Sequence, residues 1–266
     1  MSLELLINRN EMPAYKKVKE IKSGGQAAVW RGRDMDSGKY VALKYLTVRG
    51  ERRPKSAEAE EERIRFVREV KTQQDLDHPH ITPVLAYSGK VHHPWYAMPL
   101  ADDTLDDSLK GPKRDTSWSL EALHQVIDAM QYSHDRGVIH RDLKPSNVLR
   151  INGSWLVSDF GYCRNIHSES VKMTQAKALL GTWFYAAPEQ FDDAHEAGPP
   201  ADIYALGKIL MYSLTGNPPG PYLRLKGVPE QYKEVITICV AEEPEDRYQS
   251  MGELREALLT IAPRTH

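Results

Sequence analysis

Short runs of alternating apolar and polar residues dominate the first hundred positions of the chain. Such alternation is typical of β-strands with one buried face, and turn-forming Gly and Asp residues separate the runs. The predicted strands are 15–22, 28–33, 39–47, 82–87 and 94–98. One helical pattern interrupts them, because Ile64, Val67 and Val70 recur at the spacing of a helix face. We therefore expect a small, mainly antiparallel β lobe with one long helix.

From about residue 102 the apolar spacing becomes helical. The predicted helices are 117–136, 202–214, 230–240 and 250–261, with short strands at 148–151 and 155–157. Ser117 or Ser119 is expected to cap the first helix, and Gly137 to end it.

These patterns predict an α+β protein with two lobes. Residues 15–100 would form the β lobe and residues 101–261 a larger, mainly α lobe, flanked by residues 1–14 and 262–266. A ligand cleft is expected where the lobes meet, since such sites favour the junction of two units.

Composition narrows the possible partners. Lys and Arg number 35 against 37 for Asp and Glu, so no strong basic field would attract nucleic acid or anionic lipid. No window approaches ~20 consecutive apolar residues, and the first ten residues lack the pattern of a signal peptide. The two cysteines, Cys163 and Cys239, are far apart, which suits a reducing compartment. We expect a cytoplasmic location. The chain could still be a fragment of a longer receptor.

The most informative segment is 140–147, which reads His-Arg-Asp-Leu-Lys-Pro-Ser-Asn and is followed at Asp159 by Asp-Phe-Gly. Asp142 can accept the proton of an attacking hydroxyl, and Lys144 is close enough to hold a transferring phosphate. Asn147 and Asp159 offer hard oxygen ligands for Mg²⁺, with Mn²⁺ as an alternative. A solvated turn of charged residues would not produce so many ordered matches. The two motifs resemble the catalytic loop and metal-binding motif of eukaryotic-type (Hanks-type) protein kinases.

This resemblance implies a nucleotide site in the β lobe. Residues 21–29 stand where the family has its glycine-rich loop, but only Gly24 and Val29 match, while Lys22 and Ala27 replace glycines. Each added Cβ restricts the backbone near the phosphates, so we expect a weaker grip on ATP. The resemblance assigns ATP binding to Ile21, Lys22, Ser23, Gly24, Val29, Ala42, Lys44, Met98, Pro99, Ala101 and Leu149.

The same resemblance concerns the pairing of Lys44 with the long helix and one unusual residue on that helix. Lys44 would pair the phosphates and be held by Glu69, 25 residues later on the long helix. Four residues after Glu69 the family usually has an apolar side chain, and here stands Gln73. Two explanations remain open: Gln73 forms local hydrogen bonds, or the helix rests partly out of position until activation.

The segment before Glu189 is expected to regulate the protein. Residues 181–189 match the end of the kinase activation segment, and Arg247 is expected to pair with Glu189. Arg141 precedes the catalytic Asp, an arrangement that in the family often requires a phosphate on this segment. The candidate phosphate acceptors are Ser168, Ser170, Thr174 and Thr182, which are otherwise ordinary polar loop residues.

The resemblance covers residues 15–261 and implies a serine/threonine protein kinase that uses ATP and Mg²⁺, acts on protein substrates and phosphorylates itself. Lys144 and Thr182 favour Ser/Thr over Tyr acceptors, and the segment 214–219 looks bacterial. The alternative is a pseudokinase that binds nucleotide and acts as a scaffold. Neither the protein substrate nor the oligomeric state can be read from the sequence.

Overall fold

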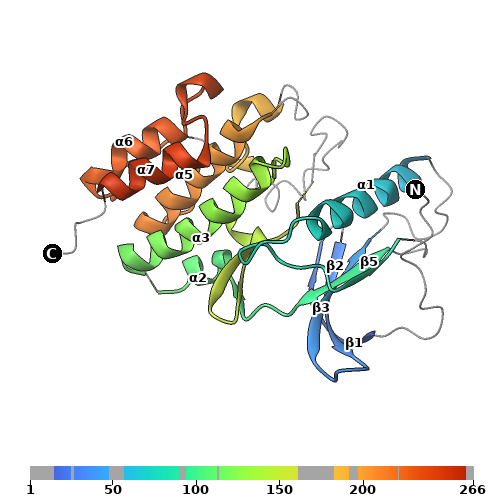
Figure 1. Ribbon diagram of the computed structural model, residues 1–266. Coiled ribbons are helices and arrows are strands. Elements are labelled where there is room, and N and C mark those ends of the chain that lie inside the picture. Colours follow the sequence, from blue (N-terminus) through green and yellow to red (C-terminus); the bar gives the residue numbers. More distant parts are fainter. Residues whose placement is uncertain are drawn as a thin grey trace. The chain divides into compact units, whose positions relative to one another are not determined.

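A computed structural model provides the fold. It describes residues 15–24, 27–47, 57–89, 94–112, 114–160, 183–191, 197–220 and 222–261. The chain forms two compact units (Figure 1). The first contains residues 1–67 and 84–100, and the second contains residues 68–83 and 101–266.

The first unit is built on a five-stranded sheet in the order β1-β2-β3-β5-β4, in which every neighbouring pair is antiparallel. The strands are β1 (Tyr15–Ser23), β2 (Ala27–Asp34), β3 (Tyr40–Leu46), β4 (Ala86–Ser88) and β5 (Trp95–Pro99). Four of the predicted strands are confirmed almost in full. The fifth, 82–87, is shorter than predicted, because β4 begins only at Ala86. Pro83 lies in the lost part, and its missing N–H cannot contribute to a sheet ladder.

Strand register sorts the first unit's side chains onto two faces. Val29 lies opposite Lys44, and Ala42 lies opposite Met98, so these four side chains share one face. The other face has Val41, Leu43 and Ala97 at its buried centre, with Trp30, Tyr45 and Trp95 packed around them. Gly32 is required here, because a Cβ at this position would clash with the side chain of the fully buried Leu43.

Helix α1 (Ala57–Gln74) is the long helix that the sequence predicts, and it runs from the first unit into the second. Within the first unit, Phe66 packs against Tyr96 of β5 with ring centroids 5.9 Å apart. Tyr96 lies opposite Lys44, so this contact places the middle of α1, around Phe66, on the Lys44 face of the sheet.

The second unit is mainly helical. Its helices are α2 (Leu105–Lys110), α3 (Thr116–His134), α5 (Pro199–Thr215), α6 (Glu230–Cys239) and α7 (Met251–Ile261). A small sheet joins β6 (Asp103–Thr104), β7 (Val148–Ile151) and β8 (Ser154–Val157). Short 3₁₀ turns cover Pro145–Asn147, Pro188–Phe191 and Pro244–Asp246. The four predicted helices are confirmed, and α2 and β6 were not predicted because both are too short to show periodicity.

Helix α5 forms the centre of this unit. It packs against α3 and α6 (Figure 1), and Ile203, Leu206, Ile209 and Leu210 are almost completely buried. A helix that is apolar on all sides is typical of a protein core. Helix α5 is therefore the central core helix of this unit, against which polar loops can be held.

The N-terminus of α3 corrects one prediction. The capping residue is Asp115, whose carboxylate accepts a hydrogen bond from the Trp118 N–H at 2.7 Å. Ser117 and Ser119, the expected caps, both lie inside the helix. Ser117 instead donates to Asp115, and Ser119 donates to the Asp115 carbonyl. Asp is as good a cap as Ser, so sequence preference alone did not separate them.

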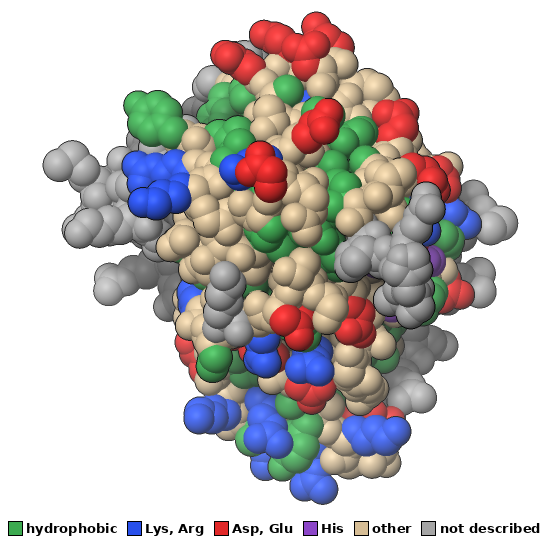
Figure 2. Space-filling view, turned by 90° about the vertical axis from the view of Figure 1, so that its left-hand side faces the viewer, with side chains coloured by type: hydrophobic (Ala, Val, Ile, Leu, Met, Phe, Trp, Pro, Cys, Tyr) green, Lys and Arg blue, Asp and Glu red, His purple; other side chains and the backbone are tan. Residues whose placement is uncertain are grey.

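The surface carries charge of both signs, as the face in Figure 2 shows, and some apolar side chains such as Val18 are exposed. Single exposed apolar side chains are normal on soluble surfaces. Among the helices of the described residues, none is both long and apolar enough to cross a lipid bilayer.

Candidate active site

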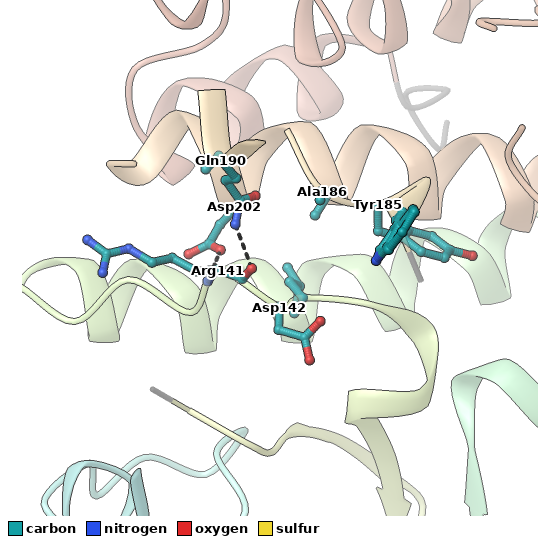
Figure 3. A pocket seen from close by; sticks show the side chains of 10 residues that line it. Arg141, Asp142, Tyr185, Ala186, Gln190 and Asp202 are labelled. Atoms are coloured by element: carbon teal, nitrogen blue, oxygen red, sulfur yellow. Dashed lines mark hydrogen bonds between the residues drawn. The ribbon is translucent and has the colours of Figure 1, made fainter. Parts of the chain in front are cut away.

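A buried carboxylate on α5 fixes the backbone of segment 140–147. Asp202 accepts a hydrogen bond from the His140 N–H at 2.9 Å. It accepts another from the Arg141 N–H at 2.8 Å (Figure 3). It also accepts one from Nε2 of His134 on α3 at 2.8 Å. Arg141 has a φ of 62°, a left-handed conformation that is costly for a residue with a Cβ. Asp202 therefore stabilises a strained backbone immediately before Asp142.

The same contacts decide the charge of Asp202, which is 1% exposed. Burial alone would raise the pKa of its carboxyl, but the hydrogen bond from His134 and the nearby imidazoles hold the pKa below its ordinary value. The carboxylate therefore stays ionised at neutral pH and keeps accepting the three hydrogen bonds.

His140 positions neighbouring backbone. Its Nδ1 accepts a hydrogen bond from the Asp142 N–H at 3.3 Å, which leaves Nε2–H to donate to the Ser158 carbonyl at 2.9 Å. The fully buried ring also packs against Phe160, with centroids 4.9 Å apart. These contacts connect segment 140–147 with the Asp-Phe-Gly segment.

Three of the predicted catalytic residues lie together. Nζ of Lys144 is 2.7 Å from Oδ2 of Asp142. Nδ2 of Asn147 donates to the Asp142 carbonyl at 2.8 Å and lies 3.4 Å from its Oδ2. The Asp142 and Lys144 side chains keep 18% and 16% exposure, so a substrate can reach them. The 3₁₀ turn Pro145–Asn147 brings Asn147 back toward Asp142.

The chemistry of Asn147 and Asp159 fits a magnesium ion. Both Asn147 contacts to Asp142 use its amide nitrogen, so its amide oxygen is the end that can bind a cation. The Ser158 N–H donates to the Asn147 carbonyl at 2.9 Å, which joins Asn147 to the residue before Asp159. The described residues contain no cluster of three His, Cys, Asp or Glu side chains suited to a metal. Mg²⁺ does not need such a cluster, because it commonly binds one or two protein carboxylates together with phosphate oxygens.

Gln73 has the hydrogen bonds that one of the two explanations requires. It is 2% exposed, and both ends of its amide are bonded. Nε2 donates to the Thr82 carbonyl at 2.8 Å, and Oε1 accepts from the Asp159 N–H at 2.9 Å. The explanation by hydrogen bonds is therefore confirmed, although one partner lies 86 residues away, and a shifted resting position of the helix stays a prediction.

The first unit gathers part of the predicted nucleotide site. Val29, Ala42, Lys44 and Met98 share one sheet face, as the register shows. Pro99 follows at the end of β5.

At the tip of the β1–β2 hairpin, Ile21, Lys22, Ser23 and Gly24 are all exposed, and the Gly24 N–H donates to the Ala27 carbonyl at 3.0 Å. Ala101, Leu149 and Glu69 belong to the second unit. Their meeting with the first set stays a prediction.

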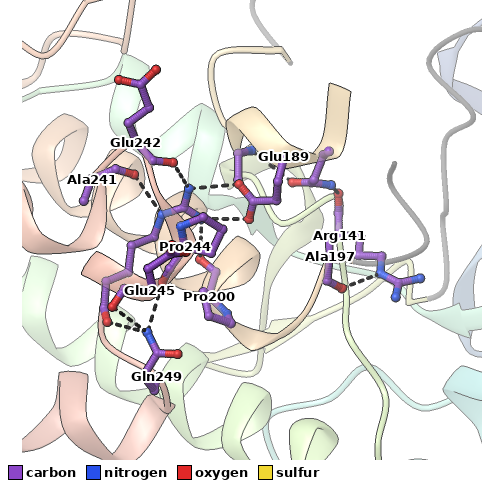
Figure 4. Close-up of polar contacts among 12 residues, drawn as sticks. Arg141, Glu189, Ala197, Pro200, Ala241, Glu242, Pro244, Glu245 and Gln249 are labelled. Atoms are coloured by element: carbon purple, nitrogen blue, oxygen red, sulfur yellow. Dashed lines mark hydrogen bonds and ion pairs between the residues drawn. The ribbon is translucent and has the colours of Figure 1, made fainter. Parts of the chain in front are cut away.

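The predicted phosphate acceptors lie outside the described residues. These are Ser168, Ser170, Thr174 and Thr182. Arg141, their expected partner, donates from Nε to the Ala197 carbonyl at 3.0 Å (Figure 4).

Beside Asp142 lies a cavity of about 30 Å³, the space of a few water molecules. Trp183, Tyr185, Ala186 and Gln190 line it together with Asp142 (Figure 3). Burial strongly raises the pKa of the Tyr185 hydroxyl, which keeps it neutral. The cavity places aromatic and small side chains next to the candidate proton acceptor.

Sequence reasoning missed Gln190. This side chain is buried, and its Nε2 donates to the Arg141 carbonyl at 2.7 Å (Figure 3). Its Oε1 accepts from the Ala187 N–H at 3.0 Å. The strained Arg141 is thus held at its N–H by Asp202 and at its carbonyl by Gln190. A polar residue directly after Pro188-Glu189 was the available signal, but it does not distinguish a buried amide from a surface one.

The expected ion pair of Glu189 and Arg247 is confirmed. Two dashed lines run to Glu189 in Figure 4, with N–O distances of 2.8 and 2.9 Å. The Arg247 side chain is 0% exposed. Its remaining donors reach the carbonyls of Ala241, Pro200 and Glu242. All five guanidinium N–H groups therefore have partners, as a buried charge requires.

Together, an antiparallel sheet unit, a helical unit and an Asp-Lys-Asn loop next to an Asp-Phe-Gly segment define the bilobal α+β protein kinase fold. The family model described as the protein kinase domain matches residues 15–263, and the chain belongs to this family. In fold, the chain is similar to the apo form of PpkA-294, with a TM-score of 0.74 and 23% identity over 93% of this chain and 97% of that one.

Curated relatives include several bacterial serine/threonine-protein kinases. A probable serine/threonine-protein kinase of Streptomyces coelicolor is 31% identical over 87% of this chain. PknB and PknH of Mycobacterium tuberculosis are 30% and 32% identical over 90% and 87% of it. The alignments cover 37%, 41% and 39% of those three proteins, so the chain spans about two fifths of their length.

Proposed function

We propose that this chain is a serine/threonine protein kinase that transfers the γ-phosphate of ATP to hydroxyl groups of proteins. The observation that carries the proposal is the grouping of Asp142, Lys144 and Asn147 on a loop whose backbone Asp202 holds. Phosphoryl transfer depends mainly on positioning and charge, and this loop supplies both.

Asp142 accepts the proton of the attacking hydroxyl as the oxygen–phosphorus bond forms and the bond to the β-phosphate breaks, which releases ADP. Its backbone cannot drift, because His140 and Asn147 both bond to it. Lys144, 2.7 Å from this carboxylate, supplies the positive charge that stabilises the transferred group.

Asn147 and Asp159 would hold Mg²⁺, which supplies charge neutralisation between the phosphates; Mn²⁺ suits the same oxygen ligands. In the first unit, Lys44 would bind the phosphates with support from Glu69. Val29, Ala42, Met98 and Leu149 would enclose the adenine, with backbone contacts from Pro99 and Ala101. The exposed hairpin at 21–24 would cover the phosphates.

For regulation, we propose that a phosphate on Ser168, Ser170, Thr174 or Thr182 pairs with Arg141 after autophosphorylation. The cytoplasm is the proposed location, because it supplies ATP and protein hydroxyls. The two-lobe division at residues 15–100 and 101–261 belongs to the same proposal.

The test is to incubate purified protein with labelled ATP, Mg²⁺ and a generic protein acceptor, and to compare Asp142→Asn with Asp75→Asn. Asp75 is an exposed carboxylate just after α1 and serves as the matched control. Labelling of Ser or Thr should fall by about three orders of magnitude in Asp142→Asn and stay unchanged in Asp75→Asn, as expected for loss of a catalytic base whose site depends on it.

A second outcome favours the scaffold alternative, which the replaced glycines at Lys22 and Ala27 support. Nucleotide binding without labelling in the wild-type protein would overturn the enzyme proposal. Labelling that is unaffected by Asp142→Asn would place the chemistry elsewhere.

A further inference from the structure

We infer that Gln73 is a positioning residue that fixes the backbone of Asp159 and couples it to the end of α1. The inference rests on the proposed function only in assigning Mg²⁺ to Asp159. It starts from two hydrogen bonds of one buried amide, one to the Thr82 carbonyl and one from the Asp159 N–H.

The bonds of Gln73 close a ring of contacts inside the second unit. The Thr82 N–H donates to the Val157 carbonyl at 2.8 Å, and the Val157 N–H donates to the His80 carbonyl at 2.8 Å. Segment 80–82 therefore runs beside segment 157–159, and Gln73 bridges the two. Its amide donates to the Thr82 carbonyl of the first segment and accepts from the Asp159 N–H of the second, which no apolar side chain can do.

The conformation of Asp159 explains why its backbone needs a fixed partner. Its φ is 65°, a left-handed value that costs free energy for a residue with a Cβ. A change of this backbone angle would redirect the Asp159 carboxylate. The hydrogen bond from the Asp159 N–H to Gln73 opposes that change.

The hydrogen bonds of Gln73 also depend on the orientation of α1. It lies in the last turn, four residues after Glu69, so both side chains emerge on the same side of the helix. Rotation of the helix would pull Gln73 away and break its hydrogen bonds with the Thr82 carbonyl and the Asp159 N–H. The orientation of α1 sets the direction of the Glu69 side chain. Through Gln73 it is thus coupled to the backbone conformation that sets the direction of the Asp159 carboxylate.

The site requires an amide rather than mere bulk. An apolar side chain of the same length would fill the same volume, but neither hydrogen bond would form. Loss of the bonds should loosen Asp159 specifically, whereas the neighbouring N–H groups of Val157 and Ser158 keep their own acceptors on His80 and Asn147. Those two groups provide an internal reference.

The first experiment measures hydrogen–deuterium exchange in the protein without nucleotide or metal. We expect the Asp159 amide to exchange about tenfold faster in Gln73→Met, because one buried hydrogen bond is lost. Gln73→Glu keeps an oxygen that can accept from this N–H, so its exchange should stay within about threefold of wild type. Gln74→Met is the matched control, since Gln74 is the exposed next residue of the same helix.

The second experiment measures phosphoryl transfer against Mg²⁺ concentration at saturating ATP. The Mg²⁺ concentration for half-maximal rate should rise about fivefold in Gln73→Met and stay unchanged in Gln74→Met, because a misplaced ligand weakens metal binding. A general loss of stability would lower the active fraction without shifting this concentration.

Wild-type exchange at Asp159 in Gln73→Met, or exchange in Gln73→Glu as fast as in the Met variant, would overturn the inference. If Gln73→Met does not fold, the Glu variant decides alone: slow exchange supports the inference and fast exchange overturns it. Absence of transfer in wild-type protein would overturn the proposed function, and the exchange rates would still decide the role of Gln73.

Discussion

The hairpin at 21–24 and the loop at 140–147 are both expected to act on the phosphates of ATP, but the chain holds them very differently. The hairpin residues are exposed, and Ile21 is 54% accessible. The Gly24 N–H bonds to the backbone carbonyl of Ala27. Segment 140–147 is held by side chains from α5 and the 3₁₀ turn Pro188–Phe191, and His134 of α3 in turn holds the Asp202 carboxylate. The hairpin departs from the family pattern, whereas the loop matches it.

This contrast follows from what each segment needs. A hairpin held by its own backbone accepts many side chains, because the ladder hydrogen bonds do not depend on them. The loop depends on named side chains, since the N–H and carbonyl of Arg141 bond to the carboxylate of Asp202 and the amide of Gln190. Substitutions that remove the contacts around the loop should therefore have larger effects than substitutions in the hairpin.

The largest effect is expected from Glu189→Ala. The substitution leaves the fully buried guanidinium of Arg247 without its carboxylate, and breaking a buried ion pair in this way costs about 3–5 kcal/mol. The free energy of unfolding, measured with urea, should fall by that amount. Glu242→Ala is the matched control, because Glu242 contacts Arg247 only through its backbone carbonyl, which the substitution keeps. Equal stability of the two variants would contradict the buried pair.

Gln190→Leu should have an intermediate effect that falls mainly on the rate. It leaves the Arg141 carbonyl and the Ala187 N–H without their partner, which should loosen the peptide before Asp142. We expect kcat to fall about tenfold, as for one buried hydrogen bond, with KM for ATP unchanged. Steady-state kinetics would check this against Gln231→Leu, an exposed glutamine on α6. A changed KM with a normal kcat would mean that Gln190 acts on the nucleotide instead.

These supports also show where sequence reasoning succeeded and where it stopped. Strands, helices and the residues at 140–147 were predictable, because periodicity and ordered motifs are local signals. The partners of the loop were harder. Gln190 and His134 look like any polar side chains in sequence, and only burial makes their hydrogen bonds decisive. Gln73 was noticed because it departs from the family, but its two partners are 9 and 86 residues away.

The smallest effect is expected at the hairpin. Replacing both Lys22 and Ala27 by glycine removes two Cβ atoms where the family brings its backbone against the phosphates. We expect KM for ATP to fall about threefold with kcat unchanged, because closer backbone N–H groups improve binding without touching the reacting atoms.

Glycine also loosens a strand, by about 0.5–1 kcal/mol for each substitution, and this cost opposes tighter binding. Lys19→Gly separates the two effects, since Lys19 is exposed on β1 and pairs with Arg31 outside the tip. If the double variant raises KM as Lys19→Gly does, the two side chains do not weaken the grip on ATP. ATP binding by the hairpin would then not depend on glycine at these two positions, because the hydrogen bonds between β1 and β2 hold the hairpin.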